Sequence, residues 1–220
     1  MTETEKRGIV YRIETARLVI RCWQPRDAPL LNAALHASWD HLRPWMPWAH
    51  GEPPALEDTV ALLRRWRGEF DLDQDYVYGI LSHDEKAILG STGLHTRRGE
   101  HAREIGYWIH ADHVKHGYAT EASAALTRIA FEVGGMRRVE IRCDPRNVRS
   151  AAVPRKLGYT HEATLRQILS IDETRASDGM VWAMLDDEYP TSPTSEFEAE
   201  AFDVLGRRLL PDALTAEDSL

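Results

Sequence analysis

Apolar and polar side chains alternate along some stretches of the chain and recur every three or four residues along others. These two patterns predict strands and helices respectively. Residues 103–110 alternate strictly, with Ile105, Tyr107 and Ile109 on one face of an expected strand. Residues 117–133 carry apolar side chains at helical spacing, and the two glycines that follow end this expected helix. The chain therefore combines strands with helices, which is typical of the α/β class.

Applied to residues 1–185, the same patterns predict eight strands and four helices in a mixed sheet with no internal repeat. The strands are expected at residues 9–13, 17–23, 76–82, 87–95, 103–110, 138–143, 161–170 and 177–185. The helices are expected from residue 27 onward and over residues 55–71, 117–133 and 149–157. Between the first two helices, Trp39, Trp45 and Trp48 stand among several prolines, which predicts a loop.

The C-terminal end of the chain differs from the rest in composition. A proline- and serine-rich segment begins at residue 189, so we expect a domain over residues 1–190 and an extension over residues 191–220. Residues 196–210 are predicted to form an amphipathic helix. Its apolar stripe consists of Phe197, Ala201, Leu205 and Leu209. An isolated helix of this length is marginal in water, so we expect it to pack on a protein surface. That surface could belong to its own domain or to a second copy of the chain, and we favour a homodimer interface.

Charge and cysteine usage narrow the classes of partner. The formal net charge is −8, and residues 186–220 hold ten Asp and Glu against two Arg, so residues 1–185 are neutral. A neutral body argues against a nucleic-acid partner. No apolar run is long enough to cross a bilayer, and the N-terminus lacks an apolar signal segment, so we expect no membrane partner. Cys22 and Cys143 lack C-x-x-C spacing, which indicates a reducing, cytoplasmic setting and no structural zinc.

The segment HVKHGYATEA, residues 113–122, places a short loop and a glycine between a strand and a helix. The first amides of a helix have no internal acceptor, and the helix dipole is positive at that end. A glycine there lets an anion approach the backbone, so the segment is a candidate phosphate cradle. Taken alone, a glycine in such a turn is more often only structural, because neither a Walker loop nor a GxGxxG string is present.

The segment DPRNVRSAAVPRKLGY, residues 144–159, follows directly on another strand. Asn147 and Ser150 flank the start of its short helix, where both residue types commonly act as caps. Residues 137–156 carry seven Arg and Lys against Glu140 and Asp144. Such a cluster indicates either a solvated face or a site for a small polyanion.

Taken together, these segments resemble the GNAT family of acyl-CoA-dependent N-acyltransferases. The strongest matches are GYWI (106–109), HGYATEA (116–122) and RVEIRCDPRNVRSAAVPRKLGY (138–159). RLVIRCWQPRDAP (17–29) and HLRPWMPW (41–48) resemble in particular the RimJ/RimL-type branch, which acetylates the N-terminal residues of ribosomal proteins.

The resemblance covers roughly residues 9–185. It implies the GNAT fold, which is a central mixed, mostly antiparallel, twisted sheet flanked by helices, with strands that splay apart at the acyl-CoA site. It also implies direct transfer of an acetyl group from acetyl-CoA to a primary amine. Neither cysteine lies in a recognisable nucleophile setting, so an acetylated cysteine is not expected. The amine could be a protein N-terminus, an amino acid, a polyamine or a drug.

The resemblance also assigns roles to individual residues. Amides near Ile109 would polarise the thioester carbonyl, Asn147 would bind the pantetheine arm, and Ser150 would protonate the departing thiolate. The loop expected to hold the CoA pyrophosphate comprises Val114, Lys115, His116, Gly117, Tyr118, Ala119 and Thr120. Trp39, Trp45, Trp48 and Trp66 could be core residues only, but in the branch the loop between the first two helices helps to wall the acceptor site, a role that suits these tryptophans.

Two positions depart from the family pattern. Pro154 stands where many members carry a tyrosine acid, and Leu169 stands where the branch carries a basic glutamate. We therefore expect a different base, with Glu104 as the first candidate because it shares a strand face with His110; Glu104 could equally be an ordinary surface carboxylate.

Two alternatives to an enzyme remain at this point. The same fold could serve as a CoA-binding sensor or docking module, or as an interaction subunit without a ligand. A metal centre is not expected, because His110, His113 and His116 fall in a predicted loop with no carboxylate to complete a ligand set.

Overall fold

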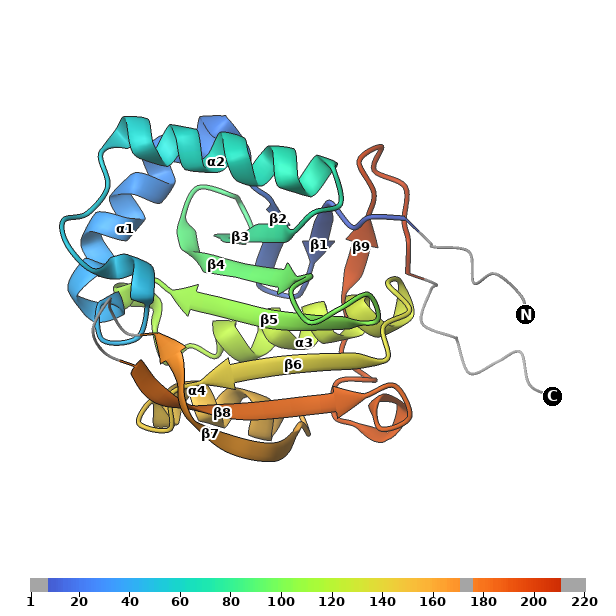
Figure 1. Ribbon diagram of the computed structural model, residues 1–220. Coiled ribbons are helices and arrows are strands. Elements are labelled where there is room, and N and C mark those ends of the chain that lie inside the picture. Colours follow the sequence, from blue (N-terminus) through green and yellow to red (C-terminus); the bar gives the residue numbers. More distant parts are fainter. Residues whose placement is uncertain (1–7, 171–175, 211–220) are drawn as a thin grey trace.

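A computed structural model describes residues 8–170 and 176–210 and shows one nine-stranded sheet with helices on both faces (Figure 1). The strands run in the order β7-β8-β6-β5-β4-β3-β2-β1-β9. Their bounds are β1 Arg12–Glu14, β2 Leu18–Cys22, β3 Tyr76–Ser82, β4 Ile88–His95, β5 Ala102–Ile109, β6 Arg138–Cys143, β7 Thr160–Ser170, β8 Ala176–Leu185 and β9 Glu200–Phe202. The helices are α1 Ala28–Leu42, α2 Leu56–Asp71, α3 Tyr118–Glu132 and α4 Val148–Lys156. This arrangement confirms the predicted α/β fold, and its elements follow the predicted order up to residue 185.

Alternating side chains divide the sheet between two apolar cores. Ile20 of β2 packs in one core with Leu126 of α3, while its neighbour Val19 packs in the other with Leu31 of α1. Helices α3 and α4 therefore cover one face, whereas α1 and α2 cover part of the opposite face (Figure 1). No helix in the described residues is long and apolar enough to span a membrane.

The central strands β5 and β6 are parallel but pair over only part of their length. Ala102–Ile105 pair with residues 138–141. Beyond these residues β5 continues to Ile109 and β6 to Cys143, but the two strands no longer pair with each other. The other edge of β5 stays paired with β4 up to Ile109. The two strands therefore splay after Ile105, as the resemblance implied, and leave one backbone edge of β5 unpaired within the described chain.

The predicted helix over residues 196–210 is wrong. Residues Glu200–Phe202 instead form β9, which pairs antiparallel with β1, and residues 203–207 form a turn closed by the Asp203 carboxylate (Figure 1). Ala201 is fully buried and Leu205 is 72% exposed, so the expected stripe does not face one surface. An unpaired edge strand offers a row of backbone hydrogen-bond groups, and pairing with β1 satisfied the segment better than a marginal helix.

Candidate active site

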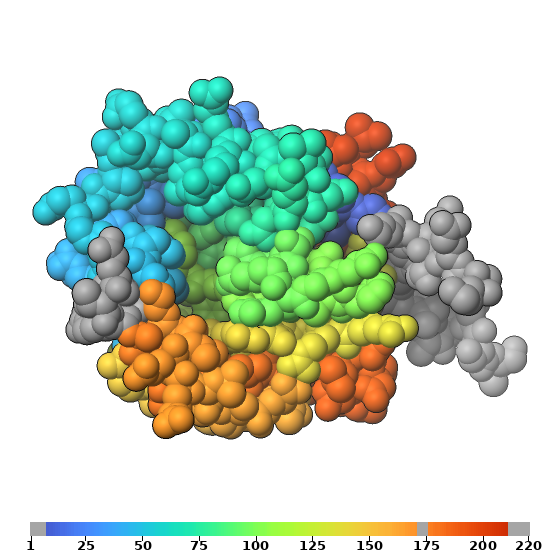
Figure 2. All heavy atoms as spheres, in the orientation of Figure 1, coloured from blue at the N-terminus to red at the C-terminus, as the bar shows by residue number. Residues whose placement is uncertain are grey.

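A cavity of about 780 Å³ lies on the face of the sheet where β5 and β6 part. Figure 2 shows the surface hollowed between the loop that joins α1 to α2, the β4–β5 hairpin and β7. Its lining includes Trp39, Trp45, Trp48 and Trp66, the aromatic residues expected to wall an acceptor site. Trp48 is 47% exposed and contacts Trp108 of β5, with ring centroids 6.4 Å apart. The cavity therefore has an aromatic mouth above a polar sheet.

The loop expected to bind pyrophosphate lies at the N-terminus of α3. Gly117 is the residue that precedes the helix, and its φ of +83° is a left-handed conformation that favours glycine. No side chain caps this helix end. The first amides of α3, from Tyr118 to Thr120, therefore have no helical acceptor and remain available to an anion.

Arg17, at the start of β2, braces this loop and was missed by the sequence analysis. Its guanidinium donates to the backbone carbonyl of His116 at 2.9 Å and lies 5.0 Å from the centre of the Tyr118 ring. It also donates to the buried carboxylate of Glu121 in the first turn of α3 at 2.7 Å. Arg17 thus ties the loop to the first turn of α3, with its charge paired to Glu121. Its place at the head of the RLVIRCW motif was the signal available in the sequence.

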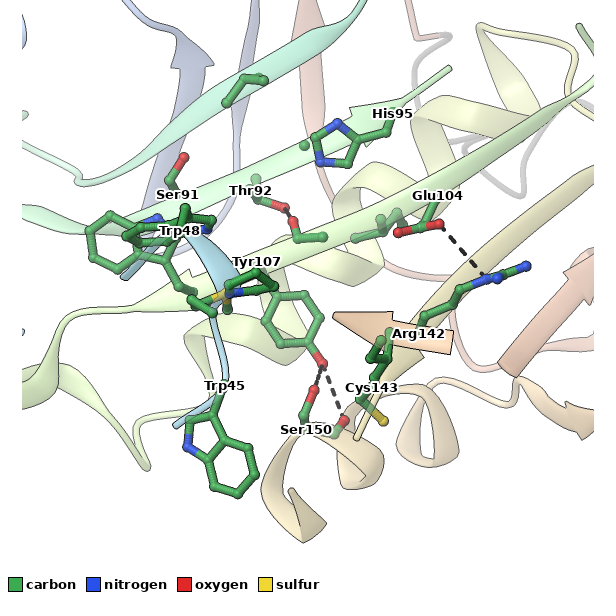
Figure 3. A pocket seen from close by; sticks show the side chains of 18 of the residues that line it. Trp45, Trp48, Ser91, Thr92, His95, Glu104, Tyr107, Arg142, Cys143 and Ser150 are labelled. Atoms are coloured by element: carbon green, nitrogen blue, oxygen red, sulfur yellow. Dashed lines mark hydrogen bonds and ion pairs between the residues drawn. The ribbon is translucent and has the colours of Figure 1, made fainter. Parts of the chain in front are cut away.

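Ser150 and Tyr107 meet at the base of the cavity, as Figure 3 shows. The Tyr107 hydroxyl lies 3.0 Å from Ser150 Oγ and donates to the Ser150 carbonyl at 3.1 Å. Burial raises the pKa of Tyr107, so its hydroxyl keeps its proton at neutral pH. Tyr107 belongs to the GYWI motif, but sequence spacing indicates no role for it, because its partner lies 43 residues away.

The capping role of Asn147 is confirmed. Its side-chain oxygen accepts the backbone N–H of Ser150 at 3.1 Å and so caps α4. Its side-chain nitrogen takes no part in this bond, and the residue also lines the cavity. The Ser150 hydroxyl is not used for capping.

Cys143, at the end of β6, lines the same cavity and is buried. Burial raises the pKa of its thiol, so the thiol is kept from ionising. Cys143 is therefore unsuited to act as a nucleophile.

Glu104 lies on the cavity face of β5 but is only 5% exposed and is enclosed by arginines. It pairs with Arg97 and Arg98 of the β4–β5 hairpin, and with Arg142 of β6 at 3.8 Å (Figure 3). Burial opposes ionisation of this carboxyl, but Arg97 and Arg98 outweigh it and lower the pKa. A general base works best when its pKa lies near the working pH, so this environment makes Glu104 a weak proton acceptor.

His110, expected to share a face with Glu104, lies beyond the end of β5 and does not line the cavity. Its Nδ1 accepts the backbone N–H of Asp112 at 3.1 Å. Burial lowers the pKa of its imidazole. Residues 8–170 and 176–210 contain no group of three or more His, Cys, Asp or Glu arranged to hold a metal ion.

Comparison with known proteins agrees with this geometry. Residues 17–160 match the family model of the acetyltransferase (GNAT) domain. The uncharacterized N-acetyltransferase YoaA of Bacillus subtilis (strain 168) is 26% identical over 158 residues, which cover 71% of this chain and 87% of that protein. The [ribosomal protein uS5]-alanine N-acetyltransferase of Escherichia coli (strain K12) is 26% identical over 166 residues, covering 73% and 84% respectively.

Solved structures share the fold. The structure of Mycobacterium smegmatis RimJ in complex with CoA-disulfide superposes with a TM-score of 0.74 at 22% identity, over 84% of this chain and 91% of that one.

The chain therefore belongs to the GNAT family. It is an acyl-CoA-dependent N-acetyltransferase that uses acetyl-CoA as co-substrate and a primary amine as acceptor.

Proposed function

We propose that the acceptor is an α-amine, either a protein N-terminus or a small-molecule amine, which enters past the tryptophans and reacts where β5 and β6 part. About 10% of an α-amine is neutral at pH 7, against about 0.04% of a lysine side chain. Arginines hold the buried Glu104 carboxylate ionised and make it a weak base. The site therefore suits the α-amine, which loses its proton more easily than a lysine side chain. The alanine acetyltransferase of E. coli adds support, because its named target is a ribosomal protein.

The residues present fit acetyl-CoA in two respects. The exposed loop of residues 115–117 ends at the open N-terminus of α3, which suits a pyrophosphate. Beyond Ile105, β5 keeps an unpaired backbone edge, including Ile109, which suits an extended pantetheine arm and the thioester carbonyl. When bound, acetyl-CoA supplies an activated acetyl group. The residues assigned to this task are Ile109, Val114, Lys115, His116, Gly117, Tyr118, Ala119, Thr120 and Asn147.

Ser150 and Tyr107 are the proton donors in this proposal. The Tyr107 proton is committed to the Ser150 carbonyl, so the Ser150 hydroxyl can donate to the Tyr107 oxygen or turn toward the cavity. The Ser150 hydroxyl thus protonates the leaving thiolate, while Tyr107 fixes its position. This pair, at the point where the strands separate, is the observation that carries the proposal.

An acetyl-CoA turnover assay with matched peptides tests the acceptor. One peptide has a free N-terminal alanine and no lysine, and the other has a blocked N-terminus and one lysine. We expect acetylation of the first at least about tenfold faster, given the difference in neutral fraction. Equal rates, or a preference for the lysine peptide, would overturn the choice of α-amine.

We also propose that the protein acts in the cytoplasm, which its two buried free cysteines support. The homodimer stays a prediction. The interface helix on which it was based does not form, because that segment pairs with β1 instead. Light scattering of the full chain measures its mass and decides between monomer and dimer.

A further inference from the structure

His95, the last residue of β4, stands on the cavity face of the sheet directly opposite Glu104 of β5. Its ring lies on two paired glycines, Gly93 of β4 and Gly106 of β5. A Cβ at position 93 would sit 2.6 Å from the ring atoms Cε1 and Nε2, closer than such atoms approach. The imidazole can therefore pack directly on the backbone because neither of these two residues has a side chain.

Asp75, just before β3, fixes the orientation of the ring. Its Oδ2 lies 2.7 Å from His95 Nδ1, and its Oδ1 accepts the backbone N–H of Thr96 at 3.1 Å. Burial opposes ionisation of Asp75, but the hydrogen bond and charge of His95, together with the backbone N–H groups of Thr96 and Tyr76, outweigh it and lower the pKa of the carboxyl. A carboxylate has no proton to give, so Nδ1 carries the hydrogen and the lone pair of the neutral ring is on Nε2.

Nε2 faces the part of the cavity where the strands separate. Gly106, whose ideal Cβ position is 3.2 Å from Nε2, is the first residue of β5 after the last pair with β6. The next residue is Tyr107, which binds Ser150. In Figure 3 the ring extends from β4 toward Thr92. Among the described residues, no side chain or backbone group hydrogen-bonds Nε2.

We propose that His95 is the general base that deprotonates the acceptor amine, and that Asp75 is its positioning residue. This inference rests on the proposed function. The ammonium group of the acceptor gives a proton to Nε2, directly or through one water. The neutral amine then forms the new C–N bond at the thioester carbonyl as the C–S bond breaks. The thiolate takes a proton from Ser150, the new amide nitrogen gives its extra proton to the Ser150 oxygen through water, and the imidazolium returns its proton to water.

The surrounding charges favour His95 over Glu104 for this task. The ionisable groups that line the same cavity include Asp75 beside the ring, Arg97 and Glu104 on the hairpin, Arg142 on β6, and Arg65 and Glu52 at the mouth. The Glu104 carboxylate is committed to arginines, whereas His95 is held by one carboxylate through the nitrogen that faces away from Gly106. A base needs an unoccupied lone pair, and Nε2 provides it.

The experiment compares wild type with His95→Gln, using the free-N-terminus alanine peptide and acetyl-CoA at several pH values. His83→Gln is the matched control, because His83 is exposed in the β3–β4 turn outside the cavity. We expect His95→Gln to lower kcat/KM about 100-fold near pH 7, within the range for loss of a general base. The loss should shrink near pH 9, where the α-amine is already neutral in solution. A merely structural role would give a loss independent of pH.

Gly93→Ala keeps the histidine but displaces its ring, so it should lower kcat in the same direction. Calorimetry with CoA shows whether each variant is folded and competent to bind. Wild type that acetylates no amine would contradict the proposed function itself. Active wild type together with a His95→Gln variant of equal kcat/KM, or with a pH-independent loss, would overturn the assignment of His95 alone.

Discussion

The hydroxyl of Tyr107 donates to the backbone carbonyl of Ser150, and this carbonyl needs a partner because of Pro154. In a regular helix the N–H of residue 154 would bond the carbonyl of residue 150, but proline has no N–H. Tyr107 reaches across from β5 and takes that place at 3.1 Å. Pro154, which departs from the family pattern, thus leaves the Ser150 carbonyl free to accept the hydrogen bond by which Tyr107 holds Ser150.

Tyr107→Phe should destabilise the protein, because it leaves the Ser150 carbonyl without its donor. We expect a loss of about 1–3 kcal/mol in the free energy of unfolding. Adding Pro154→Ala restores a helical N–H to the same carbonyl, so the double variant should recover about 1 kcal/mol or more relative to the sum of the single changes. Denaturant unfolding of all four proteins measures this coupling, and strictly additive effects would contradict the link.

Gly117→Asp should abolish CoA binding. The change forces a side chain into a left-handed backbone position and places a negative charge at the amides proposed to hold the pyrophosphate. Gly135→Asp is the matched control, because Gly135 also has a positive φ, of 60°, with open space around it. Calorimetry should show a loss of CoA affinity only for the first variant, and equal affinities would place the pyrophosphate elsewhere.

Glu104→Gln should reduce stability more than it changes chemistry. Removing one charge of a buried ion-pair cluster leaves the arginines unbalanced, which typically costs about 3–5 kcal/mol. The folded state lowers the pKa of Glu104, so its stabilising contribution is present above the ordinary glutamate pKa of about 4.3 and is lost as the pH falls through the lower, folded-state pKa.

The stability gap between wild type and Glu104→Gln should therefore be widest near neutral pH and close in acid. Melting temperatures across that range measure it. A stable variant without turnover would instead return Glu104 to the role of base.

Ala201→Asp tests whether the C-terminal segment belongs to the folded body. Ala201 is fully buried in β9, so an unpaired carboxylate there should lower the free energy of unfolding by at least about 3 kcal/mol. Val204→Asp is the control in the same segment, because Val204 is 60% exposed. Equal melting temperatures for the two variants would show that β9 contributes little to the fold.

The local pattern of apolar and polar residues was sufficient to predict most of the fold and the loop at the start of α3. The strict alternation in residues 103–110 and the glycine at the start of α3 each depend on neighbours in sequence, and both predictions agree with the structure. The helix predicted over residues 196–210 was wrong because their apolar spacing fits a helix. The free edge of β1, with which this segment pairs, lies nearly 190 residues earlier in the chain and leaves no local signal.

The catalytic geometry depends on contacts between distant segments. The partners of Tyr107 and His95 lie 43 and 20 residues away, and the arginines around Glu104 come from a hairpin and from β6. Only the strand order brings these groups together, so no spacing rule could reveal them. The tyrosine in GYWI was visible in the sequence, but its role requires the position of Pro154 in space.

Ser150→Ala tests most directly whether the acetyl group leaves CoA at the point where Ser150 and Tyr107 meet. The cap of α4 uses the backbone N–H of Ser150, which alanine retains, so the helix should be preserved. We predict a fall in kcat of about 100-fold, as for loss of a general acid, with unchanged CoA affinity and melting temperature. Unchanged kcat per folded molecule would contradict the account and leave Ser150 with a purely structural role.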